Sequence, residues 1–342
     1  MKSTYVTLCL LSLLFAVVAL FIPERPAMAE TPTNPESLNI TGPYAYENLA
    51  VFLIHDSKVA KHEDILTLQE ALAQKTITIA ETGNVNQLLA SNNGKKGVYL
   101  QSGDIVKGGR QDRVLQHDSL LAPKSKNVAL NVFCVEAGRW HGRGGESVQH
   151  FGSSTGSLMT KSQKMAVKVS ANQGEVWKSV AEAQTAVSSK LGHSVQSPTS
   201  QSSLQLSLED KKLNENISTY VRNIESQLPE AADAVGYAIA VNGNVESADI
   251  FASPQLFGKM KAKMLRSGAA EAVAEKGPGP VVTPSTAAVR TLFSDAESGA
   301  TRNEKQTLTT SVSRKETPKS VVFTTDDPRI RGKSVHKNYM SK

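Results

Sequence analysis

Cysteine is scarce in this sequence, which contains only Cys9 and Cys134 among 342 residues. Cys9 lies in an apolar N-terminal segment and follows Leu8 rather than a small residue, a context that does not suit lipid attachment. Without that segment the chain keeps Cys134 alone and forms no internal disulfide. The remaining chain, about 310 residues, is long enough to bury an adequate hydrophobic core without one.

Metal-binding spacings and clustered aromatic residues are also missing. The seven histidines form no His-x-x-x-His pair and no Cys-x-x-Cys occurs, so the sequence predicts no metal site. Aromatic residues make up 5% of the chain, and none is interleaved with its basic tail in the manner of a nucleic-acid-binding surface. We therefore expect no nucleic-acid partner and no cofactor, and no feature of the sequence specifies an oligomeric state.

The N-terminal segment has the organisation of an export signal. Lys2 supplies a positive charge, residues 5–22 are almost wholly apolar, and Ala27-Met-Ala29 supplies the small residues of a cleavage site. We expect cleavage after Ala29 and a periplasmic or secreted mature protein. The apolar run is also long enough to cross a bilayer, so an uncleaved anchor is the alternative.

Positive charge is concentrated at the C-terminus. The formal net charge of the chain is +6, and it falls to +5 when residues 1–29, with two basic residues and one acidic residue, are removed. Residues 313–342 hold eight basic and three acidic residues, also +5, so the rest of the mature chain is about neutral. Such a tail is either a solvated terminus or a contact for an anionic surface. We expect membrane contact only through this tail or an uncleaved signal.

Composition divides the chain into four parts. A signal peptide at residues 1–29 precedes a flexible lead-in at 30–47. The main domain spans 48–273 and contains a Ser/Gln/Pro linker at about 192–204. Residues 274–342, which begin with a Gly/Pro-rich break, are expected to form a polar, basic and weakly ordered C-terminal region.

Strand and helix patterns alternate in the main domain. Asn127–Glu136 alternates apolar side chains on both faces, which predicts a central strand. Val98–Leu100 and Asp104–Val106 are expected to pair with each other as a hairpin, and Asn242-Gly243 predicts another. Thr67-Leu-Gln-Glu70 is a capping box that predicts a short helix. We expect an α+β fold with a central, mainly antiparallel sheet flanked by helices, and flexible ends.

The helices of the second half follow from apolar spacing and capping residues. Apolar residues from Val176 to Leu191 repeat at helical spacing. Ser207-x-x-Asp210 is expected to begin a longer helix that Pro229 stops. Ser253-Pro254 predicts the start of another helix.

The stretch Gly103–Arg113, GDIVKGGRQDR, combines three glycines with five charged residues. It lacks the terminal Lys-Ser/Thr of a phosphate loop, so a nucleoside triphosphatase is excluded. Successive glycine amides beside Lys107, Arg110 and Arg113 suit an anion-binding nest. The alternative is a plain turn, for which glycine supplies positive φ.

Glu136 is the single residue with the greatest chemical interest. It follows a predicted buried strand, and a buried carboxylate needs a cation or hydrogen-bond donors. Arg139 and Arg113 are the expected partners, since a guanidinium holds a carboxylate through two parallel bonds. One interpretation is a structural ion pair; another is a polar pocket in which Glu136 acts as a base or contacts a ligand. A solvated strand end is the third.

Three blocks resemble the signature of one family: Gly103–Arg113, Phe133–Trp140 (FCVEAGRW) and Ser247–Phe257 (SADIFASPQLF). The family is the domain named for its association with ADP-ribosylglycohydrolases and rhodanese-like phosphatases. The resemblance covers about Leu49 to Val273, with a fainter match at Val335–Tyr339. It implies no specific reaction, because the name records an association. The matching positions are Gly108, Gly109, Gln111, Arg113, Cys134, Glu136, Arg139 and Trp140.

We expect a non-catalytic binding module for an anionic, ribose- or phosphate-bearing small molecule. The expected ligand-binding residues are Lys107, Gly108, Gly109, Gln111, Arg113, Glu136, Arg139 and Trp140. The first alternative is a hydrolase in which Glu136 is the general base and Arg113 or Arg139 stabilises developing charge. The second is a scaffold without a small-molecule site.

Overall fold

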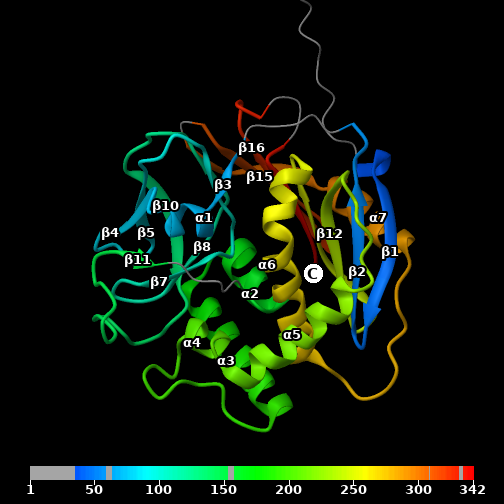
Figure 1. Cartoon of the computed structure of the whole chain (residues 1–342), viewed down its shortest axis with the longest axis horizontal. Coiled ribbons are helices and arrows are strands. Elements are labelled where there is room, and N and C mark those ends of the chain that lie inside the picture. Colours follow the sequence, from blue (N-terminus) through cyan, green and yellow to red (C-terminus); the bar gives the residue numbers. More distant parts are fainter. Residues whose placement is uncertain (1–34, 59–63, 153–157, 308, 331–333) are drawn as a thin grey trace, which may run out of the picture.

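The computed structural model describes residues 35–58, 64–152, 158–307, 309–330 and 334–342 (Figure 1). The predicted signal peptide and its cleavage site lie outside these residues. Within them, strands form three sheets, and one strand pair, β3 with β6, is parallel. The predicted α+β fold with mainly antiparallel sheets and flanking helices is confirmed. None of the helices in the described ranges combines the length and hydropathy that crossing a bilayer requires.

The largest sheet has eight antiparallel strands in the order β1-β2-β12-β13-β17-β16-β15-β14. In that order the strands span Asn39–Tyr46, Leu49–His55, Ala234–Val241, Asn244–Phe251, His336–Ser341, Ser320–Asp326, Ser311–Glu316 and Ala300–Gln306. β12 and β13 form the predicted hairpin. Asn242 and Gly243 turn it with φ values of 50° and 84°, because two-residue hairpin turns that match strand twist need positive φ.

Helices cover both faces of this sheet. Alternate residues of β2 point to opposite sides, so Val51 and Leu53 pack in the core that includes helices α5 and α6. Phe52 and Ile54 pack in the core that includes α7. The helices are η1 (Pro35–Ser37), α1 (Leu68–Ala73), α2 (Lys161–Met165), η2 (Ala166–Ser170), α3 (Gln173–Leu191), α4 (Leu204–Leu208), α5 (Lys211–Glu225), α6 (Pro254–Glu275) and α7 (Thr286–Glu297).

A six-stranded sheet, in the order β11-β7-β8-β10-β5-β4, forms the second body of strands. Figure 1 shows it on the other side of α6 from β1 and β2. Its strands span Phe151–Gly152, Ile105–Gly108, Arg113–Leu115, Val128–Cys134, Gln87–Asn92 and Ile77–Glu81. β10, the strand predicted to be central, lies between β8 and β5. The predicted capping box is present at the start of α1.

The predicted hairpin between Val98–Leu100 and Asp104–Val106 is wrong. β6 (Val98–Leu100) pairs with β3 (Leu66–Thr67) and β9 (Ser119–Leu121) in a small third sheet. β7 pairs with β8 and β11 instead. The Asp104 carboxylate closes a turn by accepting from the Gln101 amide at 3.1 Å, and this turn sends the chain from one sheet to the next.

Two helix starts were predicted with different success. Ser253 caps α6 with Pro254 at its first position, as expected. The long helix α5 begins one turn later than predicted, because Asp210, not Ser207, is its N-cap and accepts from the Leu213 amide at 2.9 Å. Ser207 belongs to the short helix α4, which follows the predicted linker.

The C-terminal region is built into the fold and is not the weakly ordered tail expected from its polarity. It supplies α7 and strands β14 to β17, and β17 pairs with β13 and β16 inside the large sheet. Val312, Val321, Phe323 and Met340 form a small core. The basic residues Lys315 and Lys337 both lie 2.8 Å from the Glu297 carboxylate. Composition alone misleads here, because the four apolar residues of this core are spread over three strands of a mostly polar region.

Candidate functional site

The sequence blocks around Asp112 and Glu136 meet at the end of β10 in a buried ion-pair network. Glu136 is fully buried, and its carboxylate lies 2.7 Å from Arg139 Nη2 and 3.1 Å from Arg143 Nη1. Asp112 is also fully buried and accepts two hydrogen bonds from Arg143, of 3.0 and 3.1 Å. The predicted pairing of Glu136 with an arginine is confirmed for Arg139. Together with Asp112 and Arg143, these two residues form a four-residue cluster.

Neutral groups complete this network. The Asp112 amide donates to Glu136 Oε2 at 3.1 Å, and Gln111 Nε2 donates to the Glu136 carbonyl oxygen at 2.7 Å. The Gly108 amide and Ser203 Oγ donate to the Asp112 carboxylate at 3.0 and 2.9 Å. The network thus links the glycine loop, the end of β10 and the start of α4, and its polar groups are used by the protein itself.

Burial and ion pairing act in opposite directions on these carboxyl groups. Burial, together with the Glu136 charge, raises the pKa of Asp112. Burial also acts to raise the pKa of Glu136, but hydrogen bonds from Ser200, the Asp112 amide and Arg139 bring it below its ordinary value. A general base must reach a proton of its substrate, whereas the Glu136 carboxylate is enclosed by protein. This environment favours a structural role for Glu136.

The glycine loop turns its amides towards the protein's own acids. Gly108 and Gly109 have φ values of +118° and +57°, in the region that favours glycine. The Gly108 amide donates to Asp112, and the Arg110 amide donates to Glu81 Oε1 at 3.0 Å. The amides of the expected anion nest are therefore engaged internally, and the interpretation as a turn describes the loop better.

Arg113 was expected to reach Glu136, but it faces Glu81. It is fully buried, and its Nη2 lies 3.6 Å from Glu81 Oε1. Its guanidinium also lies 5.8 Å from the centre of the Trp140 ring. Arg143, which no sequence pattern marks in its Gly/Ser loop, takes the position beside Glu136 and Asp112.

The remaining predicted residues lie at the surface of this cluster. Lys107 is half-buried and donates to Glu209 at 2.5 Å. Trp140 is 43% exposed and, with Trp177, borders an apolar pocket of about 310 Å³. Other residues lining this pocket include Gln111, Cys134 and Arg139. The structure thus brings Gln111, Arg139 and Trp140 to one pocket edge and leaves Lys107 in a surface ion pair.

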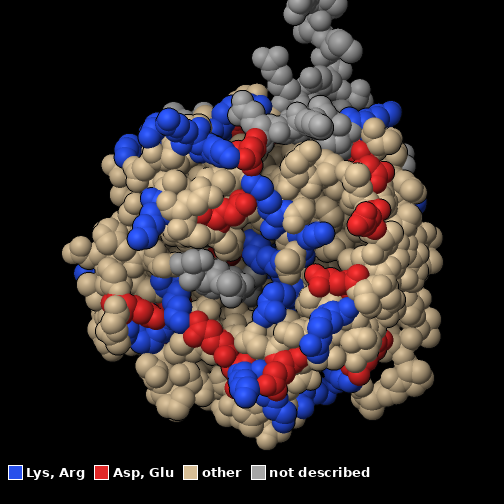
Figure 2. All heavy atoms as spheres, in the orientation of Figure 1, with Lys and Arg blue, Asp and Glu red and all other residues tan. Residues whose placement is uncertain are grey.

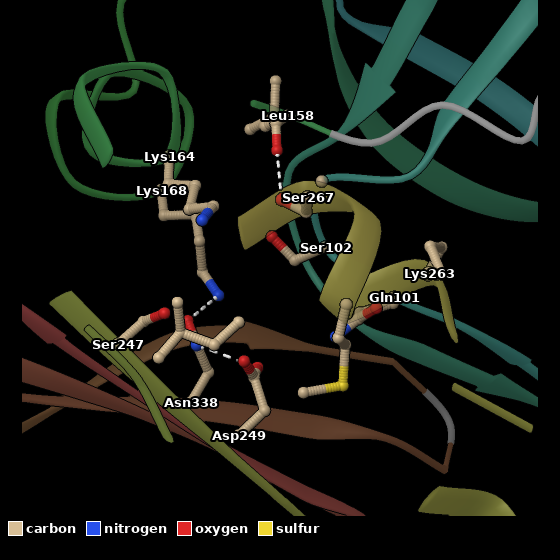
Figure 3. Close-up of a pocket in the computed structure, with 13 residues that line it drawn as sticks. Gln101, Ser102, Leu158, Lys164, Lys168, Ser247, Asp249, Lys263, Ser267 and Asn338 are labelled. Carbon is tan, nitrogen blue, oxygen red and sulfur yellow. Dashed lines mark hydrogen bonds between the residues drawn. The ribbon is translucent and has the colours of Figure 1, made fainter. Parts of the chain in front are cut away.

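A different cavity, which we call the lysine cavity, lies where both halves of the chain meet (Figure 3). Its volume is about 50 Å³. Its lining includes the turn at residues 101–103 after β6, the helical turns α2 and η2, helix α6, and strands β12, β13 and β17. Figure 2, which has the orientation of Figure 1, shows Lys and Arg side chains gathered in the hollow at the centre of the face in view.

Three ammonium groups line the lysine cavity. Lys164 comes from α2, Lys168 from η2 and Lys263 from α6. Lys164 Nζ lies 3.3 Å from Glu271, and Lys263 pairs with Asp104. Both acids are buried, and neither lines the cavity. They hold the two ammonium groups in place without filling the space in front of them.

Lys168 differs from the other two lysines because no carboxylate of the described residues lies within ion-pair distance of its Nζ. It is 7% exposed, donates to Asn338 Oδ1 at 2.6 Å and lies 4.7 Å from the Phe323 ring centre. Burial lowers its pKa, although the charges of Asp118 and Asp249 act in the opposite direction. A buried ammonium that lacks a direct counter-ion is costly, and it projects towards Asn338 in the cavity of Figure 3.

A chain of hydrogen bonds supports Asn338 from behind. Asn338 Nδ2 donates to Asp249 Oδ1 at 2.9 Å, and this oxygen also lies 2.9 Å from His336 Nε2. The other ring nitrogen of His336 lies 2.7 Å from Asp118 Oδ2. Because both partners are carboxylates, both nitrogens donate and the ring is an imidazolium. The pKa of His336 is raised: burial acts to lower it, and the Asp118 and Asp249 carboxylates outweigh that effect.

The lysine cavity was missed by the sequence-based prediction. Its lysines and Asn338 come from three segments far apart in the chain, and none lies in a recognisable motif. The nearest available pattern was the i,i+4 spacing of Lys164 and Lys168, which by itself indicates a solvated face. No group of three or more His, Cys, Asp or Glu side chains within the described ranges is arranged to hold a metal ion.

These features define a class of protein: an α+β fold with a buried arginine–carboxylate network in one half and a lysine-lined cavity between its sheets. Residues 37–340 match the model of the ARG and Rhodanese-Phosphatase-superfamily-associated Protein domain, and the chain belongs to this family. The resemblance of the three sequence blocks is thereby confirmed, and the match extends through the C-terminal strands. No curated protein and no solved structure matches the chain.

Proposed function

We propose that the protein is an exported, non-catalytic binding module for a small molecule with an anionic group, and that this group binds in the lysine cavity. The observation that supports the proposal most is Lys168, a buried ammonium that lines the cavity and has no carboxylate of the described residues within ion-pair distance. Each ammonium has three donors, and Asn338 takes one of those of Lys168. Asp249 also lines the cavity, but its carboxylate is bonded to Asn338 and His336. An anion in the cavity gives Lys168 the direct negative partner that Asp249 does not.

The size of the cavity favours a compact head group. A cavity of about 50 Å³ holds roughly four waters when each needs about 10–15 Å³. That space suits a phosphate or sulfate group, with any attached ribose lying towards the surface. Ser247 and Gln101 also line the cavity and supply neutral polar groups beside the lysines.

The proposal moves the ligand away from the residues first predicted to bind it. The donors of the glycine loop and the arginines near Glu136 are bonded to the protein's own acids. A hydrolase that uses Glu136 as base receives no support from a carboxylate that is 0% exposed. We assign the arginine–carboxylate network the scaffold role, and the signal-like N-terminus favours export of the mature chain.

Isothermal titration calorimetry with inorganic phosphate and with ADP-ribose tests the proposal. We expect saturable binding to the mature chain and at least about a tenfold loss of affinity in Lys168→Met, since a direct charged contact is worth about 1.5–3 kcal/mol. Lys305→Met is the matched control, because Lys305 is also a partly buried lysine but lines a separate cavity. Unchanged affinity in a folded Lys168→Met protein, or no binding of either probe, contradicts the proposal.

A further inference from the structure

A second, larger cavity, which we call the β10–β14 cavity, lies between the β9–β10 segment and the C-terminal strands. Its volume is about 530 Å³, and its lining comes from residues between Ser119 and Asn131 and from residues 305–307, 309 and 310. Small-molecule sites commonly measure about 300–1,000 Å³. It shares no lining residue with the lysine cavity.

Lys305 contributes a positive charge to the lining of this cavity. Its Nζ donates to the Ala129 carbonyl oxygen at 3.3 Å, and no carboxylate in the described part of the chain lies within ion-pair distance of it. Burial alone lowers the pKa of Lys305 to about 8. The ammonium thus lines the cavity at a cost in solvation that no neighbouring acid offsets.

Two hydroxyl groups in the same cavity also lack partners. Ser119 is 2% exposed, and the buried Oγ atoms of Ser119 and Ser125 make no hydrogen bond with the residues that the structure describes. Both residues line the cavity. Buried polar atoms are rarely left unsatisfied in native proteins, and such atoms call for an explanation. Together with Lys305 they provide three donors at one site.

The rest of the lining combines apolar residues with polar ones such as Asn127, Asn131 and Gln306. Leu120, Leu121 and Val128 contribute branched side chains, and Ala122 and Ala129 leave room between them. Lys126 also lines the cavity but is bonded to Asn93 Oδ1. One unpaired ammonium with two hydroxyl donors matches a monoanion that accepts through two oxygens, and the apolar walls match an aliphatic or aromatic body.

We propose that the β10–β14 cavity is a second ligand site, which binds a carboxylate with an apolar body through Lys305, Ser119 and Ser125. The site is independent of the anion site in the lysine cavity. Because it lies between β10 and β14, it exists only when the C-terminal strands are packed against the first half of the chain.

The test compares octanoate with octanol on the mature full chain by isothermal titration calorimetry. We expect octanoate to bind and octanol to bind at least tenfold more weakly, because only octanoate carries the charge. Lys305→Met and, separately, Ser119→Ala are expected to weaken octanoate binding, the first by tenfold or more. Lys168→Met is the matched control and is expected to leave octanoate affinity unchanged.

Several results overturn this second site. One is equal binding of octanoate and octanol. Another is octanoate affinity that survives Lys305→Met and Ser119→Ala in proteins with normal melting curves. The third is loss of octanoate binding in Lys168→Met. Phosphate binding measured on the same variants keeps the two proposals apart. If the octanoate test fails, phosphate affinity still depends on Lys168. If the phosphate test fails, octanoate affinity still depends on Lys305.

Discussion

At the scale of single residues, the buried charges of this protein divide into those that are compensated and those that are not. Glu136 and Asp112 each meet guanidinium groups and backbone amides inside the first half of the chain. Lys168 and Lys305 line cavities without a carboxylate at contact distance among the described residues. Compensated charges suit a structural role, because removal of one partner leaves the other buried and unpaired. The uncompensated lysines are therefore the better candidates for ligand contacts.

The first residue-scale prediction concerns stability. Glu136→Gln keeps the shape of the side chain but leaves Arg139 and Arg143 short of one negative charge, so we expect unfolding free energy to fall by about 3–5 kcal/mol. Urea denaturation measures it. Glu182→Gln, an exposed position on α3, is the control and is expected to stay within about 0.5 kcal/mol of the unsubstituted protein. A loss below about 1 kcal/mol in Glu136→Gln argues against the structural role.

At the scale of elements, local signals were easier to interpret than pairings. The capping box at Thr67, the Asn242-Gly243 turn and the Ser253-Pro254 helix start each depend on a few adjacent residues, and all were predicted. The partners of β6 and β7 were not, because β6 pairs with β3 and β9, whereas β7 turns through the glycine loop to pair with β8. The C-terminal strands were missed because the region is polar overall: β15 has one apolar residue, Val312, and the apolar run of β16 is only Val321–Phe323.

The position of β17 gives an element-scale prediction. Removal of residues 335–342 deletes a strand that pairs with β13 on one side and β16 on the other, and it exposes two strand edges. We expect the shortened protein to lose its cooperative thermal transition, measured by circular dichroism and calorimetry. Deletion of Lys342 alone removes a surface ion pair with Glu316 and is expected to cost at most about 1 kcal/mol. A normal transition in the longer deletion contradicts the assigned topology.

At the scale of the whole molecule, buried polar contacts join the two bodies of strands. Asp118 precedes β9 in the first half, whereas His336 and Asp249 lie at the centre of the large sheet. Glu136 and Arg139 are close in sequence, so their pairing was predictable from spacing. The lysine cavity and the His336 contacts join residues more than 60 positions apart, and no single-sequence pattern specifies them.

The His336 contacts predict how stability depends on pH. The folded-state pKa of His336 is raised above 6.5, so its contribution is complete below about pH 6.5 and is lost as pH rises through the folded value. We expect unfolding free energy to decrease above pH 6.5 by up to about 1.4 kcal/mol per pH unit. Urea midpoints between pH 6.5 and 9 measure this slope.

Other groups near His336 set the control for this prediction. Asp118, whose pKa is lowered by His336 despite its burial, stays ionised across that range. Lys168 has a lowered folded-state pKa and therefore acts in the opposite direction as pH rises. Tyr99 and Asp249 are the other titratable groups near His336. Burial raises the pKa of Tyr99. The difference between the unsubstituted protein and His336→Gln isolates the histidine, and identical slopes for the two proteins contradict its assignment as an imidazolium.

The position of a bound anion tests the central claim most directly. Crystals of the mature protein grown with selenate, a heavier relative of sulfate, reveal that position through the anomalous scattering of selenium. We predict a peak in the lysine cavity within hydrogen-bond distance of Lys168 Nζ, absent from crystals of Lys168→Met. A cavity without a peak, or a peak that persists in Lys168→Met, contradicts the account.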